Sequence, residues 1–284
     1  MDQIKIHVFH TGEVCVAPDL PFGGDHCNIL KASGLFTKKE DRLWLPVSAY
    51  LIECKHGKIL FDCGWHRNMS PKGVYDKKAQ IQSLGSWFLY KINQGKIDQG
   101  KAIDEQLKKL GILAKDLDLV LLSHLDCDHA NGLKLVKDAK RILVSNEELK
   151  FACKKNIVNK VRYNSNWWKN TKIEGFDWNN TEGPVKKSYD VFGDKSIEMI
   201  NIPGHSDGLC ALKIKNSKGK YVLLFSDGGY AEKSWKELIT SGVAADKNAQ
   251  KKSLEWIRKE SLDSNCIESL ANHDRDILPH TIIL

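Results

Sequence analysis

The stretch Ser123-His124-Leu125-Asp126-Cys127-Asp128-His129-Ala130-Asn131-Gly132 decides how the rest of this sequence is interpreted. It follows residues 117–122, an apolar run that is too short for a helix and therefore predicts a buried central strand. Four potential metal ligands fall within six residues, and we expect residues 124–136 to turn into a helix. Imidazole and carboxylate groups suit zinc, iron or manganese, and four such groups exceed what one catalytic zinc needs. Two carboxylates beside two histidines need a cation to balance them, which predicts a site for two divalent metal ions.

Further candidate ligands stand where other elements are expected to end. His205 and Asp227 come after two apolar runs, residues 197–202 and 221–226, and Asp62 comes after a third, while His273 follows a helical pattern. Each residue taken singly has an ordinary interpretation, such as a turn former, a helix N-cap or a surface histidine. Their joint occurrence at successive strand ends favours one shared site.

The remaining pattern predicts strands that alternate with helices. We expect strands at 4–10, 46–53, 58–61, 117–122, 141–145, 197–202, 210–214, 221–226 and 276–284, and helices at 103–110, 146–152, 233–239 and 247–262. Residues 65–100 are interpreted as a long connection with short helices, and residues 156–188 as a loop, a lid or a strand insertion. Because no linker separates the two halves, we expect a single layered α/β domain over residues 1–284.

Composition narrows the class of protein. The 284 residues are 42% hydrophobic and 28% charged, which is ordinary for a globular chain. The net charge of +7 is dispersed rather than clustered, so it indicates a solvated lysine-rich surface and not a nucleic-acid partner. No signal peptide or membrane span is visible, and none of the eight cysteines forms a CxxC pair. We therefore expect a cytoplasmic protein that acts on a small molecule away from membranes, with reduced cysteines; its oligomeric state stays open.

The order of these motifs resembles the five-motif pattern of the metallo-β-lactamase superfamily. The matching residues are Phe61-Asp62-Cys63-Gly64, His124-x-Asp126-x-Asp128-His129, Pro203-Gly204-His205, Asp227 and His273. The resemblance extends over residues 46–274. It implies an αββα sandwich, in which two mixed sheets are flanked by helices and the metals lie at one edge of the sheets.

Within the superfamily, the sequence is most similar to the N-acyl-homoserine-lactone lactonases. Residues 45–47, 50–53 and 57–62 carry this likeness, together with Tyr230, which stands three residues after Asp227. In that branch the matching tyrosine contacts the carbonyl or the leaving oxygen of the substrate.

The resemblance also implies a role for each candidate residue. It assigns His124, Asp126 and His205 to the first metal, assigns Asp128, His129 and His273 to the second, and makes Asp227 the bridge between them. Asp62 would orient a ligand histidine, as metal-bound imidazoles usually require, and Ser123, Asn131 and Ser206 would give further support.

One residue departs from the family pattern. The family usually has histidine at the position of Asp126. A carboxylate there adds a negative charge, so we expect iron or manganese to compete with zinc more than at an all-histidine site, and a bound water to be less acidic. The flavodiiron branch carries a related carboxylate, but this chain shows no flavodoxin domain.

The sequence thus predicts hydrolysis of a lactone or other carboxylic ester by a hydroxide that bridges two metals. Tyr230 would hydrogen-bond the developing oxyanion and Asp128 would carry a proton. Tryptophans in 65–90 and 167–178 are candidates for an apolar acyl pocket or for core packing. Two alternatives stay open: a phosphodiesterase or nuclease of the same fold, and a non-catalytic metal- or redox-sensing module with Cys127 beside the ligands.

Overall fold

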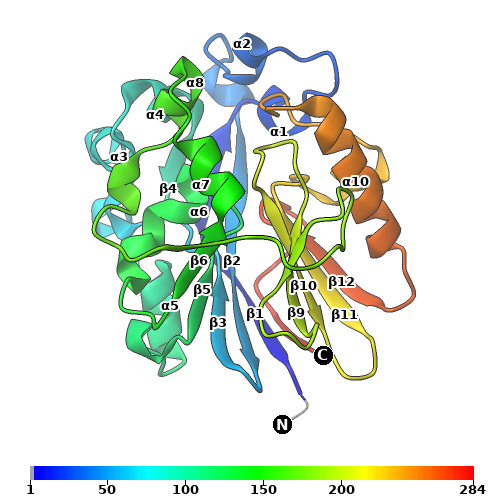
Figure 1. The fold of residues 1–284 in the computed structure, drawn as a ribbon. Coiled ribbons are helices and arrows are strands. Elements are labelled where there is room, and N and C mark those ends of the chain that lie inside the picture. Colours follow the sequence, from blue (N-terminus) through cyan, green and yellow to red (C-terminus); the bar gives the residue numbers. More distant parts are fainter. Residues whose placement is uncertain (1–2) are drawn as a thin grey trace.

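The computed structural model describes residues 3–284, and two β-sheets face each other at its centre (Figure 1). The first sheet has the strand order β13-β1-β2-β3-β5-β6-β7, and β4 pairs with β1. Its strands are β1 (Lys5–Val16), β2 (Leu43–Cys54), β3 (Gly57–Phe61), β4 (Gln94–Lys96), β5 (Leu119–Leu121), β6 (Ile142–Ser145), β7 (Glu174–Phe176) and β13 (Thr281–Ile283). The pairs from β3 to β7 are parallel and the other pairs are antiparallel, so the sheet is mixed.

The second sheet has the order β12-β11-β10-β9-β8. Its strands are β8 (Ser188–Asp190), β9 (Ile197–Asn201), β10 (Cys210–Lys215), β11 (Tyr221–Ser226) and β12 (Cys266–Ala271). Only β11 and β12 pair in parallel. Consequently β9, β11 and β12 all run in one direction and end at the same edge of the sheet.

Helices cover the outer face of each sheet (Figure 1). Those bordering the first sheet and its connections are α1 (Asp19–Phe22), α2 (Ile29–Ala32), α3 (Lys77–Leu84), α4 (Trp87–Ile92), α5 (Ile103–Lys109), α6 (Cys127–Ala130), α7 (Asn146–Ala152) and α8 (Ile157–Arg162). The second sheet is covered by α9 (Glu232–Lys236) and α10 (Lys247–Ser261). Short 3-10 turns occupy Lys39–Asp41, Arg67–Met69, Pro71–Gly73, Ala114–Asp116, Asn131–Val136 and Ser165–Trp167.

Alternation along the central strands explains why the molecule is layered. In β5, Leu119 and Leu121 join the core between the two sheets, whereas Val120 packs against the helices outside. In β11, Leu224 points to the central core and Leu223 to the layer under α10. Successive side chains of a strand point to opposite faces, so a strand that is apolar throughout needs cover on both sides. The expected αββα sandwich is confirmed.

The elements differ from the expectations in several places, and three of these differences bear on the site. Residues 156–188, interpreted as loop-like, contain α8, β7 and β8. The strand β12 was not expected, and His273 therefore follows a strand rather than a helix. The helix expected over residues 124–136 begins only at Cys127 and continues as a 3-10 turn after Ala130. Among residues 3–284, no helix combines the length and the apolar character that crossing a membrane requires.

Candidate metal centre

All seven predicted metal donors lie together where strands of the two sheets end. His124, Asp126, Asp128 and His129 follow β5 of the first sheet, whereas His205, Asp227 and His273 follow β9, β11 and β12 of the second. Two groups of donors, His124 with Asp126 and His205, and Asp128 with His129 and His273, each place their ligand atoms within 4.8 Å of one another. The elements therefore converge on two adjacent sites.

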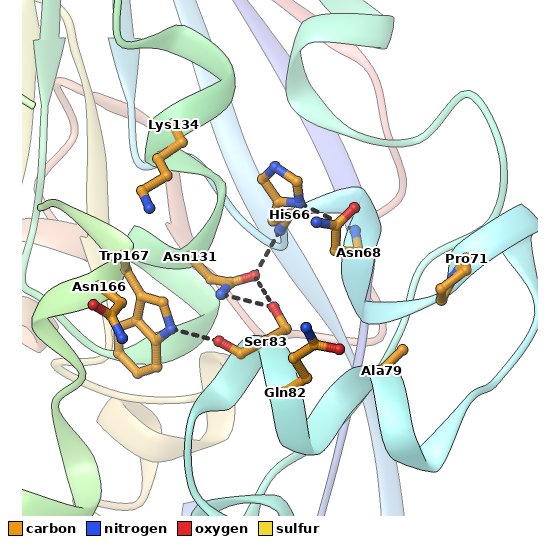
Figure 2. A pocket seen from close by; sticks show the side chains of 10 residues that line it. All are labelled: His66, Asn68, Pro71, Ala79, Gln82, Ser83, Asn131, Lys134, Asn166 and Trp167. Atoms are coloured by element: carbon orange, nitrogen blue, oxygen red, sulfur yellow. Dashed lines mark hydrogen bonds between the residues drawn. The ribbon is translucent and has the colours of Figure 1, made fainter. Parts of the chain in front are cut away.

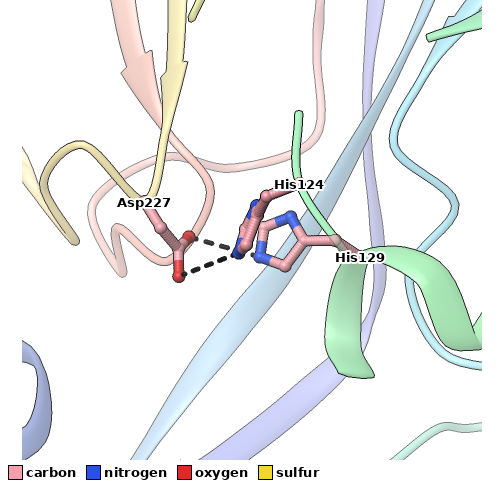
Figure 3. A group of neighbouring side chains, drawn as sticks. All are labelled: His124, His129 and Asp227. Carbon is pink, nitrogen blue, oxygen red and sulfur yellow. Dashed lines mark ion pairs between the residues drawn. The ribbon is translucent and has the colours of Figure 1, made fainter. Parts of the chain in front are cut away.

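Asp227 faces both groups, with Oδ2 toward His124 of the first and Oδ1 toward His129 of the second (Figure 3). Its Oδ1 is 3.2 Å from Nε2 of His129 and 3.1 Å from Nε2 of His273. Its Oδ2 is 3.6 Å from Nε2 of His205 and 3.9 Å from Nε2 of His124. This is the arrangement that a carboxylate bridging two cations needs.

Several of the donor atoms are buried without a hydrogen-bond partner. They are Nε2 of His124, His129 and His273, and Oδ1 of Asp227. Leaving a buried polar atom unpaired costs about 1–3 kcal/mol, so four such atoms clustered in one centre require an explanation. Two divalent cations would satisfy all four, and the donor set of imidazoles and carboxylates fits zinc, iron or manganese.

In three of the candidate ligand histidines, Nδ1 is hydrogen-bonded to an acceptor. Nδ1 of His129 lies 2.8 Å from Oδ2 of Asp62, and Nδ1 of His273 lies 2.7 Å from the carbonyl oxygen of Pro46. Nδ1 of His124 lies 2.9 Å from Oγ of Ser123. A proton on Nδ1 leaves the lone pair on Nε2, so each ring is oriented to bind a metal through its inner nitrogen.

Asp62 connects three parts of the chain behind the donors. It sits at the end of β3 with φ +60° and accepts hydrogen bonds from the backbone nitrogen and the hydroxyl of Ser123, at 2.8 and 2.7 Å. The side-chain amide of Asn272 approaches the same carboxylate at 3.3 Å. The expectation that Asp62 orients a candidate ligand histidine agrees with these contacts.

Glu148 joins the loops that carry the donors, a role that the sequence analysis did not anticipate. This buried residue of α7 accepts from the backbone nitrogen of Leu125 at 3.1 Å and from the hydroxyl of Ser206 at 2.6 Å. It thereby ties the loop after β5 to the loop after β9.

Arg162 is a second residue of the centre that the sequence analysis missed. It ends α8, and its Nε and Nη2 donate to the two oxygens of Asp126 at 2.6 and 2.8 Å. Its Nη1 donates to the backbone oxygen of His205 at 3.0 Å. Burial alone would raise the pKa of Asp126, but the Arg162 charge and hydrogen bonds from His124 and His205 hold it well below its usual value. The sequence contains one signal for this contact: Asp126 adds a carboxylate to the motif, and a buried carboxylate needs a positively charged partner.

Asp227 and the second group of donors favour positive charge, whereas burial and the Arg162 charge lower the pKa of His205 to about 4. Burial would lower the pKa of His129, but Asp227 and Asp62 raise it well above its ordinary value. Burial would also lower the pKa of His273, but Asp227 and Asp128 raise it above its ordinary value. Surplus carboxylate charge in a buried place is what a divalent cation neutralises.

An apolar pocket of about 350 Å³ opens onto the donors. Asp126, Asp128, Asp227 and Tyr230 lie at its polar end, and its walls come mainly from β1, α2, α4 and α8. The wall residues are mostly aliphatic or aromatic and include Val14, Val16, Leu20, Ile29, Leu30, Leu35, Phe88, Leu89, Ile92, Ile157, Val158, Val161 and Val243.

The tryptophans do not line this pocket. Trp65 is fully buried in the core, Trp178 packs against the layer between the sheets, and Trp167 borders another cavity. Of the two tryptophan-rich segments, only 65–90 contributes to the pocket wall, through Phe88 and Leu89. Core packing is therefore the interpretation that holds for Trp65, Trp167 and Trp178, whereas Trp87 is exposed.

Tyr230 borders both the donors and the pocket. Its ring stacks on His273 with centroids 5.2 Å apart. Burial first, and then the charges of Asp227, Asp126 and Asp128, raise its pKa well above the ordinary value of 10. The phenol therefore stays protonated at neutral pH and can serve as a hydrogen-bond donor.

The other cavity is polar and lies beyond the turn that follows the donor motif (Figure 2). Asn131 accepts from the backbone nitrogen of His66 at 2.8 Å, and its amide donates to Ser83 at 3.2 Å. Nε1 of Trp167 donates to the backbone oxygen of Ser83 at 2.9 Å. The two bonds of Asn131 hold the turn after His129 against His66 and α3.

Known proteins resemble this chain in sequence. A curated relative, the N-acyl homoserine lactonase AttM of Rhizobium radiobacter, is 26% identical over 243 residues, which cover 82% of this chain and 83% of the relative. The N-acyl homoserine lactonase AiiB of Agrobacterium fabrum is 27% identical over 249 residues, with coverages of 82% and 80%.

Solved structures resemble the fold. An N-acyl homoserine lactone hydrolase, solved with the product N-hexanoyl-L-homoserine at its catalytic metal centre, has a TM-score of 0.71 at 21% identity and covers 96% of this chain and 94% of its own. AidC, a dizinc quorum-quenching lactonase, has a TM-score of 0.62 at 13% identity, with coverages of 96% and 88%.

The family itself is shown by a match over more than half of the sequence. Residues 42–219 match the family described as the metallo-beta-lactamase superfamily. This range includes the motif from His124 to His129 as well as His205, and the two-sheet architecture agrees with it. The chain belongs to the metallo-β-lactamase superfamily, and among curated proteins it is similar to N-acyl homoserine lactonases.

Proposed function

We propose that this protein is a dinuclear metal-dependent hydrolase that cleaves a lactone or another carboxylic ester bearing an apolar acyl group. The observation that carries the proposal is the apolar pocket that ends on Asp126, Asp128, Asp227 and Tyr230. A substrate whose acyl chain fills this pocket would have its carbonyl end beside the donors. The relatives named as N-acyl homoserine lactonases support the same class of bond.

The seven donors would hold two divalent ions, zinc, iron or manganese. When bound, such ions activate a water molecule as nucleophile and polarise the carbonyl group. His124, Asp126 and His205 would hold one ion, Asp128, His129 and His273 the other, and Asp227 would bridge them.

The residues around the ions have separate tasks. Tyr230, held protonated, donates a hydrogen bond to the oxygen on which negative charge develops. Asp128 lines the pocket beside His273, at 3.5 Å between Oδ2 and Nε2, and can receive a proton from the nucleophile and pass it to the leaving alkoxide. The aliphatic walls exclude water from the acyl chain.

Neither alternative function is favoured by the site. A phosphodiesterase or nuclease would need cations to hold phosphate groups, but Arg162 is the only lysine or arginine in the lining of this pocket within the described residues, and it is bound to Asp126. A redox sensor that works through Cys127 would need a reactive thiol. Burial first, and then Asp128 and Asp126, raise the pKa of Cys127 well above its usual value, so this thiol stays protonated and unreactive.

The test begins with the metal content of the freshly purified protein, followed by assays on lactone, thioester, β-lactam and phosphodiester substrates. We expect two equivalents of metal and the highest kcat/KM on lactones with an aliphatic acyl chain. Two bound metals with phosphodiesters hydrolysed faster than any carboxylic ester would contradict the proposed substrate class.

The dependence of kcat/KM on acyl chain length tests whether the apolar pocket binds the acyl group. Each methylene buried in the pocket contributes about 0.8 kcal/mol, so kcat/KM should rise about fourfold per methylene until the pocket is filled. Val161→Trp should shorten the pocket and stop the rise at a shorter chain. The matched control is Val74→Trp, at an exposed valine outside the pocket, which should leave the series unchanged.

A further inference from the structure

Arg162 is the only guanidinium that contacts two of the first metal's proposed ligands among the residues that the structure describes. It binds both carboxylate oxygens of Asp126 and, through its third nitrogen, the backbone oxygen of His205. The side chains are largely buried, with 15% of Arg162 and 13% of Asp126 exposed. A bidentate pair of this kind fixes the carboxylate plane as well as its charge.

We propose that Arg162 is a positioning residue for the first metal site, and that Asp126 and Arg162 together act on the metal as one neutral ligand. This inference rests on the proposed metal centre. In it, Asp126 supplies an oxygen donor in the place where an imidazole would supply a nitrogen, and Arg162 cancels the charge that this exchange introduces.

The distances show that Asp126 can serve Arg162 and a metal together. Its Oδ2 lies 2.8 Å from Nε2 of His205 and 3.4 Å from Nε2 of His124, so it faces the same point as the two imidazoles. A carboxylate oxygen has two lone pairs, which allows Oδ2 to accept from Nη2 and still present a lone pair to a cation. Asp126 can therefore bind Arg162 and a metal ion at the same time.

The second site has no such partner. Within residues 3–284, the ion pairs of Asp128 and Asp227 involve only imidazoles, those of His124, His129, His205 and His273. The guanidinium thus accompanies the one carboxylate that stands in place of a histidine. Its position weakens the sequence-based argument that Asp126 makes the centre more negative and so favours iron or manganese.

The inference predicts a specific pattern of metal affinity in a set of variants. Asp126→His alone leaves the Arg162 cation uncompensated beside a dication, and the affinity for the first metal should fall at least tenfold. Adding Arg162→Gln removes that cation, and the double variant should recover affinity to within about threefold of the wild type. The double variant Asp126→His with Arg162→Lys keeps a cation and should not recover.

The experiment titrates each purified variant with a chelator of known zinc affinity and follows bound zinc per chain by elemental analysis. A purely structural role for Arg162 predicts the opposite order, because removing it could only damage the site further. If the double variant with Arg162→Gln binds the first zinc no better than Asp126→His alone, the inference is wrong.

A second measurement covers the case in which Asp126→His does not fold. In the Asp126 background, Arg162→Gln leaves a buried carboxylate without its guanidinium, so zinc should raise the Tm of this variant by more than it raises that of Arg162→Lys. Equal rises in Tm would overturn the inference. A wild-type protein that binds no metal would instead refute the proposed function, so the two failures are distinguishable.

Discussion

Asp227 is the residue on which the proposed dinuclear arrangement depends, because each of its oxygens faces one group of donors. Asp227→Asn replaces one oxygen by an amide nitrogen that cannot bind a cation. We expect the variant to lose at least one metal per chain and to lose at least about a hundredfold in kcat, since even residues that only orient ligands contribute 10–100-fold. Elemental analysis and steady-state kinetics measure both.

Asp276→Asn is the matched control, because this exposed aspartate lies three residues after His273 and outside the donor groups. It should keep both metals and full activity. An Asp227→Asn protein with two metals and unchanged kcat would contradict the bridging role.

Tyr230 offers a test that separates catalysis from packing. Tyr230→Phe removes the hydroxyl but keeps the ring that stacks on His273. We expect kcat to fall about a hundredfold, as for the loss of one oxyanion donor, with metal content and Tm unchanged. Tyr75→Phe, which removes a hydroxyl bonded to Tyr90 and Gln94, should leave kcat unchanged. Equal kcat values for Tyr230→Phe and the wild type would remove Tyr230 from the mechanism.

His10 in β1 makes the stability depend on pH. Burial first, and then the charges of Lys101 and His280, lower its pKa to about 4. In the unfolded chain the imidazole binds a proton below its ordinary pKa of 6.5, whereas the folded protein keeps it neutral until about 4. The unfolded state therefore gains protons first, and stability falls as pH decreases from 6.5 toward 4.

Urea unfolding at pH 7.5 and pH 5.0 measures this effect. After allowance for the partial exposure of His10, its contribution to the loss of stability between the two pH values is about 1 kcal/mol. His10→Gln should reduce the pH-dependent loss by that amount. The same loss in both proteins would show that His10 does not titrate as its burial implies.

At the scale of elements, the turn after the donor motif is pressed against the end of β3. The backbone nitrogen of Gly132 donates to the carbonyl oxygen of Gly64 at 2.8 Å. A Cβ at this position would lie 2.3 Å from the carbonyl oxygen of Cys63. Gly132→Ala must therefore push the turn away from β3.

We expect Gly132→Ala to lower the free energy of unfolding by about 1–3 kcal/mol, as overpacking does, and to weaken metal binding because His129 and the turn move together. Denaturant unfolding and zinc titration check the two effects. Wild-type stability with wild-type zinc affinity would show that this contact does not hold the donor loop in place.

The strand ends were predictable from sequence, whereas their surroundings were not. Apolar runs followed by His or Asp placed six donors at their strand ends, because a buried strand fixes the residue after it. The end of β12, which precedes the seventh donor His273, escaped prediction because Ile267 and Leu270 are separated by polar residues and only one face of this strand is strongly apolar. Arg162 and the pocket wall depend on how α8 packs, which local pattern does not encode.

At the scale of the whole molecule, the donors are divided between two sheets. The run from His124 to His129 follows a strand of the first sheet, and His205, Asp227 and His273 follow strands of the second. Ions bound between them would connect the layers, so they would stabilise the folded state but not the unfolded chain. Metal removal should therefore affect the entire fold.

Thermal unfolding with and without a chelator tests this. A thousandfold excess of free metal over its Kd stabilises the native state by about 4 kcal/mol, and the Tm should rise accordingly when zinc is restored. Asp227→Asn should show a smaller rise than the wild type. If chelation removes two zinc ions from the protein without changing its Tm, the metals do not stabilise the fold.

The position of His273 after β12 has a consequence for biosynthesis. A nascent chain that has been translated as far as Asp227, just after β11, already carries six of the seven donors, but Oδ1 of Asp227 still lacks its contact with Nε2 of His273. His273 reaches the other donors only when β12 has paired in parallel with β11. A metal ion bound at this centre would therefore meet the full set of seven donors only after β12 has been translated and paired.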